Sequence, residues 1–291
     1  MRQDALSVRF ADPGKRNLIG LSPEELEEFF CGLEERPYRV KQLLAWLYRR
    51  NTLDFQSMTD MSLRLRKQLE LIASLSLPKL IREERSADGT RKWVIDVGAG
   101  QAIETVYIPE PKRATLCISS QAGCAMDCSF CATGREGFNR NLSSAEILAQ
   151  VLIARRALGS EVPITNVVFM GMGEPLANYR NVVPVVQLLV DDRAFGLSRR
   201  RVTISTAGLV PQILKLSKDC NVALAVSLHA PNDALRDELV PINRRHPIAE
   251  LLGACWDYAE CLASRQVTFE YAMLRDVNDG IAQARELTDL L

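Results

Sequence analysis

Short segments rich in apolar and β-branched residues alternate with longer helical patterns from about residue 115 to residue 291, and this alternation limits the folds open to the chain. The strand candidates are residues 115–119, 166–170, 201–205, 223–227 and 267–273. The helix candidates span approximately residues 143–158, 180–192, 209–218, 247–263 and 281–291. Such alternation predicts parallel βα units, and therefore either a doubly wound sheet or a barrel. Ahead of it, two β-rich segments flank Gly98-Ala99-Gly100 and predict a hairpin.

The first eighty or so residues have a helical pattern instead. Ser22-Pro23-Glu24-Glu25 is a capping box with proline at the first helical position, and residues 37–50 and 62–75 carry apolar stripes at helical spacing. The stretch 78–89 is the best candidate for a boundary. We therefore expect a helical domain over residues 1–85 and a second domain over residues 86–291.

One part of the helical region is strongly basic. From Arg36 to Arg50 there are five basic residues and no acidic one, with Tyr38, Trp46 and Tyr48 interleaved. Basic residues beside aromatic ones suit RNA, and Arg39, Lys41, Arg49 and Arg50 would be its phosphate-contacting side chains. A solvated helix face over core aromatics explains the same pattern, and the residues alone leave both interpretations open.

Composition excludes several classes of protein. The 291 residues carry 36 Lys+Arg against 36 Asp+Glu and are 47% hydrophobic, which describes a globular chain of one or two domains and excludes disorder. The net charge of zero gives no global attraction to nucleic acid, so any RNA-binding surface must be local. No stretch approaches eighteen consecutive apolar residues, and the start lacks the apolar region of a signal peptide. We expect no membrane association and a cytoplasmic location.

Eight cysteines in a reducing compartment need a reason other than disulfides. Four of them are scattered and read as small buried hydrophobes: Cys31, Cys220, Cys255 and Cys261. The other four fall within fifteen residues, and Cys124, Cys128 and Cys131 form a C-x3-C-x2-C triplet. Three such thiolates can ligate three irons of a [4Fe–4S] cluster and leave the fourth iron open, as in a catalytic metal centre. A zinc site would need a fourth ligand, and the only histidines lie about a hundred residues away.

The triplet resembles the signature of radical S-adenosyl-L-methionine (SAM) enzymes. Five segments are similar to one branch of that superfamily, the RlmN/Cfr family of adenosine methyltransferases: residues 103–134, 163–183, 200–211, 222–245 and 269–280. The resemblance implies a partial TIM-type (β/α)6 barrel, with about five strands present, behind a small N-terminal helical RNA-binding domain and a β-hairpin.

The likeness is greatest to the branch that methylates C2 of adenosine in 23S rRNA and tRNA through a methyl-cysteine intermediate. The implied cofactors are a [4Fe–4S] cluster and SAM. The implied partners are 23S rRNA, tRNA and an electron donor such as flavodoxin. Chemistry on a base requires it to be presented unstacked, and RNA loops supply such bases.

The resemblance also implies roles for individual residues. Cys124, Cys128 and Cys131 would ligate the cluster. Gly173 and Glu174, in the segment GMGEP, would bind the amino end of SAM, because glycine allows close backbone approach and a carboxylate suits an ammonium group. The residues expected at the nucleoside end of SAM are Ser205, Ser227, Leu228 and His229.

Two further residues would act on the RNA. Glu104 occupies the family's position for the base that removes the adenosine C2 proton, and Cys117 that of the cysteine that resolves the protein–RNA crosslink. In the family the methyl-carrying cysteine lies in a C-terminal segment that this sequence is not expected to contain, and none of Cys220, Cys255 and Cys261 has its surroundings. The alternatives are therefore a C8-specific Cfr-type methyltransferase and a catalytically incomplete iron–sulfur or RNA-binding fragment.

Overall fold

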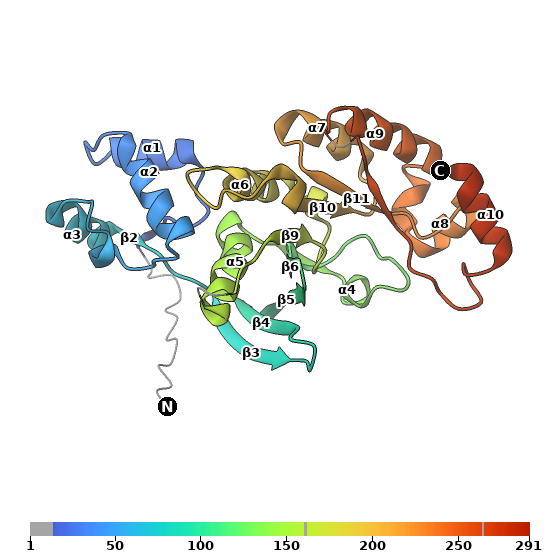
Figure 1. Ribbon diagram of the computed structural model, residues 1–291, viewed down its shortest axis with the longest axis horizontal. Helices are drawn as coiled ribbons and strands as arrows, with labels where there is room; N and C mark the ends of the chain where they lie inside the picture. The colour runs from blue at the N-terminus through green and yellow to red at the C-terminus, as the bar shows by residue number, and fades with distance from the viewer. Residues whose placement is uncertain (1–13, 160–161, 264) are drawn as a thin grey trace. The chain divides into compact units, whose positions relative to one another are not determined.

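The computed structural model describes residues 14–159, 162–263 and 265–291, which divide into two compact units. Unit 1 comprises the chain up to Ile118 together with Leu142–Val167 and Arg180–Ser198. Unit 2 comprises Ser119–Asn141, Val168–Tyr179 and Arg199–Leu291. The elements of both units are traced in Figure 1.

Unit 1 begins with the predicted helices, which are confirmed as α1 (Pro23–Cys31), α2 (Tyr38–Leu44) and α3 (Leu63–Ile72). The capping box holds the start of α1: the Ser22 hydroxyl accepts from the Glu25 N–H at 3.2 Å, and the Glu25 carboxylate accepts from the Ser22 N–H at 2.7 Å. A single π-helical segment, η1 (Ala45–Arg49), continues α2, because the Arg50 N–H donates to the Ala45 carbonyl at 3.0 Å. A 3-10 turn, η2 (Phe55–Ser57), follows.

A pair of short parallel strands, β1 (Arg16–Asn17) and β2 (Ala73–Ser74), joins the two ends of this helical region. Unit 1 then forms an antiparallel sheet from β3 (Lys79–Arg85), β4 (Arg91–Gly98), β5 (Gln101–Glu110) and β6 (Arg113–Cys117). The predicted hairpin is confirmed as β4–β5, with positive φ at Gly98, Ala99 and Gly100. Strand β3 lies in the segment 78–89 and was not predicted from the sequence; the division of the chain at residues 85 and 86 stays a prediction.

Helix α5 (Ser144–Leu158) packs on this sheet. The buried Thr105 hydroxyl donates to the Gln150 side chain at 2.7 Å, and Arg91 donates to the Ala157 carbonyl at 3.1 Å. Helix α6 (Tyr179–Val190) supplies buried valines and leucines on its inner face. In the part of the chain that the structure describes, no helix combines the length and apolar character needed to cross a membrane.

Unit 2 confirms the predicted parallel βα alternation. Strands β10 (Val202–Thr206), β11 (Ala223–Ser227) and β12 (Thr268–Glu270) pair in parallel, and β9 (Asn166–Phe169) is the neighbour of β10. Its helices are α7 (Val210–Asp219), α8 (Asp233–Leu239), α9 (Ile248–Glu260) and α10 (Ile281–Leu290), and short 3-10 turns are η3 (Pro175–Asn178), η4 (Arg199–Arg201) and η5 (Pro241–Arg244). Strand β12 is three residues long, shorter than the predicted segment 267–273, and α8 was not predicted.

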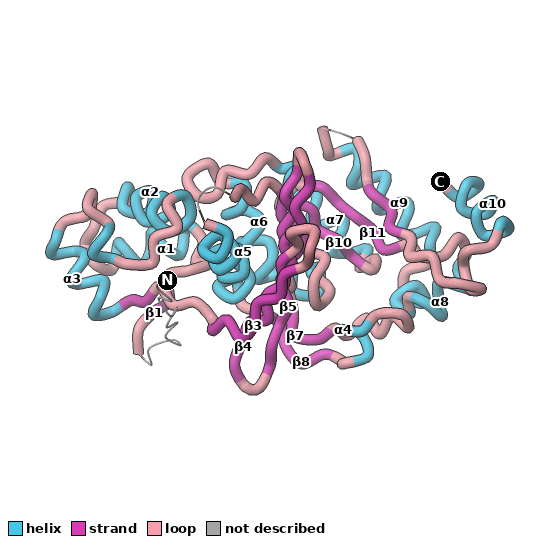
Figure 2. Tube along the Cα trace, turned by 60° about the horizontal axis from the view of Figure 1, so that its bottom comes forward, coloured by secondary structure: helices cyan, strands magenta, loops and turns pink. Residues whose placement is uncertain are grey.

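A small antiparallel ribbon in unit 2 was also not predicted. It consists of β7 (Gln121–Gly123) and β8 (Phe138–Asn141), and the chain between these strands contains the one-turn helix α4 (Ala132–Arg135). Figure 2 shows β7, α4 and β8 as one continuous excursion of the chain. All three cysteines of the triplet belong to this excursion.

Candidate active site

The ribbon β7–β8 positions the cysteine triplet. Gly123 has φ +76°, and a Cβ there would lie 1.9 Å from the Gly137 carbonyl oxygen, so the two strands meet at a point where only glycine fits. The next residue, Cys124, donates its N–H to the same carbonyl at 3.0 Å. At the other end of the loop Cys131 is the N-cap of α4. The ribbon and the helix therefore hold the first and last cysteine, and all three thiols are half-buried.

Burial raises the pKa of the Cys124 thiol, and it raises that of Cys128 to about 12, with smaller contributions from the neighbouring cysteines and Glu174. Without a bound cation these thiols are therefore protonated. Three half-buried thiols on one loop are the donor set that a [4Fe–4S] cluster with one open iron requires, and the metal would supply the charge that makes them thiolates. No group of three His, Cys, Asp or Glu side chains among the described residues surrounds a single metal-ion position.

Arg236 places a positive charge beside this loop. Its side chain is fully buried, and its guanidinium donates to four neutral acceptors: the carbonyls of Leu228 (3.1 Å), Ala207 (2.7 Å) and Ser227 (3.0 Å) and the Asn243 side-chain oxygen (2.9 Å). No carboxylate forms an ion pair with it in the described residues. Burial lowers its pKa to about 10, and Cys128 is the group whose negative charge would stabilise it most. An anionic cluster at Cys128 would therefore compensate a charge that is costly to bury alone.

The GMGEP loop brings Glu174 against the ribbon and β10. Gly173 has φ +95°, and a Cβ there would lie 2.4 Å from the Gln121 Cβ, so glycine is required for this close approach. The Glu174 N–H donates to the Gln121 side-chain oxygen at 2.8 Å. Its carboxylate accepts from the N–H groups of Leu176 (3.0 Å) and Ala207 (2.7 Å). The side chain is buried, and desolvation raises its pKa to about 7, so a cationic ligand would favour its charged form.

The ends of the three parallel strands meet at Glu270, a residue that was not predicted from the sequence. Its carboxylate accepts from the hydroxyls of Ser205 on β10 (3.0 Å) and Ser227 on β11 (3.4 Å). Its carbonyl oxygen accepts from the N–H groups of Leu228 (3.0 Å) and His229 (3.2 Å). The structure thus brings together the residues predicted for the nucleoside end of SAM, although the Leu228 side chain packs in the core with Ile248 and Leu252.

His229 is held in one orientation. Its backbone has φ +58°, and its Nδ1 accepts from the Ala272 N–H at 3.0 Å. Burial, with a smaller contribution from Arg236, lowers its pKa to about 4, so the ring is neutral with its proton on Nε2. The ring lies edge-to-face with Phe130 of the cysteine loop, at 4.8 Å between centroids. A neutral imidazole with Nε2–H can donate one hydrogen bond to a ligand.

The two remaining predicted residues belong to unit 1, whereas the triplet and all the SAM candidates belong to unit 2. Glu104 lies on β5 with an exposed side chain, 3.1 Å from the Lys92 ammonium. Cys117 is the last residue of β6, half-buried and in register with Val106 of β5. Their roles stay predictions.

Comparisons with known proteins agree with this geometry. Residues 16–75 match the family described as Ribosomal RNA large subunit methyltransferase N-terminal domain, and residues 118–287 match the Radical SAM superfamily. The chain is 50% identical over 282 residues to a protein named dual-specificity RNA methyltransferase RlmN from Francisella tularensis subsp. novicida (strain U112). The same figures hold for the protein of that name from F. tularensis subsp. mediasiatica (strain FSC147), and the match covers 95% of this chain and 76% of each relative.

A solved structure also matches. The crystal structure of a radical SAM methyltransferase from Sphaerobacter thermophilus superposes with a TM-score of 0.87 at 44% identity, covering 95% of this chain and 82% of that one. The predicted resemblance and the predicted α/β fold, a partial barrel-like sheet with an N-terminal domain, are confirmed. The chain therefore belongs to the RlmN family of radical SAM RNA methyltransferases.

Proposed function

We propose that this protein methylates C2 of adenosine in 23S rRNA and tRNA. The observation that carries the proposal is the assembly in unit 2 of a half-buried cysteine triplet, a buried carboxylate and the polar ends of three parallel strands. The 50% identity to a dual-specificity RNA methyltransferase supports the same reaction and both RNA substrates.

Cys124, Cys128 and Cys131 would hold a [4Fe–4S] cluster, and SAM would occupy the ends of the strands beside it. When bound, this pair supplies one-electron chemistry that can functionalise a carbon no ordinary methyl donor alkylates. Glu174 would bind the ammonium group of SAM, since its carboxylate is already oriented by two N–H groups. Ser205, Ser227 and the Nε2–H of His229 would bind the ribose hydroxyls and the adenine edge, with Glu270 orienting both serines.

The residues of unit 1 would act on the RNA. Glu104 would accept the proton from adenosine C2, with Lys92 holding its carboxylate in place at 3.1 Å. Cys117 would resolve the covalent link between protein and base. An electron donor such as flavodoxin and a cytoplasmic location belong to the same proposal.

The test is to express the 291-residue chain in cells that lack 2-methyladenosine and to analyse rRNA and tRNA nucleosides by mass spectrometry. We expect 2-methyladenosine in both RNAs, and its formation by these 291 residues would mean that an internal cysteine, Cys255 or Cys261, carries the methyl group. The Cys128→Ala variant should lose it, while Cys31→Ala, at an exposed cysteine in the N-terminal helices, should keep it. Formation of 8-methyladenosine would favour a Cfr-type enzyme, and the absence of both bases would contradict the proposal.

A further inference from the structure

Unit 1 contains a cavity of about 910 Å³ where the end of the π-helix η1 meets α5 and the segments that follow α5 and α6. Four arginines line it, two from each side: Arg49 and Arg50 from the helical region, and Arg155 and Arg156 from α5. Its remaining wall includes apolar side chains such as Ile164 and Phe195.

The four guanidinium groups have no carboxylate partner within ion-pair distance among the described residues. Arg155 is fixed by the main chain, since it donates to the carbonyls of Tyr48 and Arg49. Arg50 lies 4.0 Å over the Trp46 ring. The Arg193 side chain, which binds the Asp191 carboxylate at 2.8 Å, is the main cause of the lowered pKa of Asp191, and the charge of Arg49 makes only a small contribution to it. In a chain with 36 basic and 36 acidic residues, four arginines around one cavity with no ion-pair partner among the described residues are a local concentration of positive charge.

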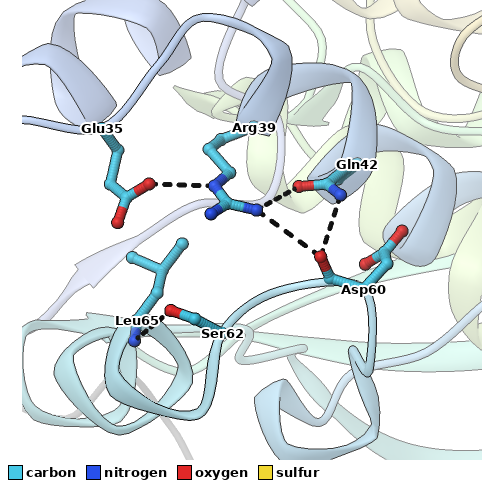
Figure 3. Close-up of polar contacts among 6 residues, drawn as sticks. All are labelled: Glu35, Arg39, Gln42, Asp60, Ser62 and Leu65. Carbon is cyan, nitrogen blue, oxygen red and sulfur yellow. Dashed lines mark hydrogen bonds and ion pairs between the residues drawn. The ribbon is translucent and has the colours of Figure 1, made fainter.

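Arg39 of the same basic stretch behaves differently. Its Nε lies 2.9 Å from the Glu35 carboxylate, and its Nη1 donates to the Gln42 side-chain oxygen at 2.8 Å. Gln42 in turn donates to the Asp60 carbonyl at 3.0 Å, and Figure 3 shows Arg39 enclosed by these partners. The expectation that Arg39 contacts phosphate is therefore not supported, because its guanidinium already ties α2 to the loop before α3. Within the basic stretch, Arg39 therefore has a structural role, whereas Arg49 and Arg50 line the cavity.

We propose that this cavity binds a phosphate and its adjoining nucleotide of the RNA substrate, away from the target adenosine. Guanidinium groups bind phosphate oxygens through two parallel hydrogen bonds, and an apolar wall accepts the face of a base. Two of the arginines lie in the region that matches the rRNA methyltransferase N-terminal domain. The inference rests on the proposed RNA substrate, and it names the side chains of unit 1 that would hold that substrate.

The test uses the whole chain and two of the exposed arginines, Arg49 and Arg156, one from each side of the cavity, which are replaced singly and together by glutamine. Affinity for a tRNA transcript is measured by fluorescence anisotropy at several salt concentrations. Each lost phosphate contact should reduce the log–log salt slope by about 0.7 to 0.9, so the double variant should lose about twice that. Arg156→Lys should keep most of the slope. Retained SAM binding and an unchanged melting temperature would show that the fold is intact.

The matched control removes two charges elsewhere in the same helical region. Arg64→Gln with Lys67→Gln on α3 should leave the slope within about 0.3 of the parent, because both side chains are exposed and lie outside the cavity. An equal loss in this control, or an unchanged slope in the cavity double variant, would overturn the proposal. A further result would also overturn it: millimolar inorganic phosphate or a mononucleotide binds to the chain but does not lower its affinity for tRNA. The cavity would then be a site for a free anion and not for RNA. Failure of the methylation assay with a normal tRNA salt slope would instead count against the proposed function alone.

Discussion

At the scale of single residues, burial in unit 2 reverses the usual order of two pKa values, those of Glu174 and His229. Desolvation raises the pKa of Glu174 from 4.5 to about 7 and lowers that of His229 from 6.5 to about 4. Between these values both groups are neutral in the folded chain. Burial makes both side chains neutral, because glutamate and histidine side chains at the surface would be charged at pH 5.5.

These two shifts make opposite contributions to the dependence of stability on pH in the metal-free chain. Glu174 takes up a proton on folding, so its contribution is complete below about pH 4.5 and is lost as pH rises towards 7. His229 gives up a proton on folding, so its contribution is complete above about pH 6.5 and is lost as pH falls towards 4. Each shift corresponds to about 3 kcal/mol. Between pH 5 and 6.5 the two slopes should nearly cancel.

Substitution of either residue should therefore reveal the contribution of the other to the slope of the free energy of unfolding against pH. In Glu174→Gln the free energy of unfolding should rise more steeply with pH than in the parent between pH 5 and 6.5. In His229→Asn, which keeps a residue that tolerates φ +58°, it should fall more steeply. Urea unfolding at half-unit pH intervals measures both. Parallel pH curves for the parent and both variants would contradict the shifts.

At the scale of elements, the ribbon β7–β8 is the part of the fold on which the cysteine loop depends most. Gly123→Ala would bring a Cβ to 1.9 Å from the Gly137 carbonyl, which is the acceptor of the Cys124 N–H. We expect iron bound after anaerobic reconstitution to fall below half of the parent value. Gly137→Ala is the matched control, because its backbone is also left-handed at φ +73° but its Cβ would meet nothing within 4 Å. Equal iron content in the two variants would refute this account.

The sequence predicted the long elements and missed the short or charged ones. Strand β3 reads KLIREER, in which five of seven residues are charged, and no apolar alternation marks it. It is held by cross-strand pairs such as Lys92 with Glu84 at 3.2 Å, which become visible only when β4 lies beside it. The ribbon strands β7 and β8 have three and four residues, too few for a periodic pattern.

The presence or absence of a local pattern also decides which residues of the candidate site can be predicted from the sequence. The triplet, Gly173 and Glu174 carry a local spacing, so the sequence predicts them. Glu270 acts through partners 41 to 65 residues away and Arg236 through partners 7 to 29 residues away, which no local pattern encodes. Glu270 lies in the middle of the predicted strand 267–273, and only the structure shows that it ends the strand β12 (Thr268–Glu270).

At the scale of the whole molecule, cluster binding should stabilise the two units unequally. All three ligand cysteines, Arg236 and Glu174 belong to unit 2, and a ligand that binds only the native state stabilises the region it contacts. Hydrogen exchange of the chain before and after reconstitution should show slower exchange in residues 121–141 by at least tenfold, with little change in α1 to α3. Equal protection of α1 to α3 would contradict this expectation.

The π-helical turn at Ala45–Arg49 also sets the direction, around the helix axis, in which the residues after it point. Each residue of an α-helix advances the chain by about 100°, and a π-turn inserts one residue into the helix without breaking it. Removal of one residue there would rotate everything that follows by roughly that angle relative to the core face at Leu43 and Leu44. Arg49 and Arg50 would then point away from α5, with charge and composition otherwise unchanged. Related chains that differ by one residue at this turn should therefore differ in the direction of their arginines rather than in their number.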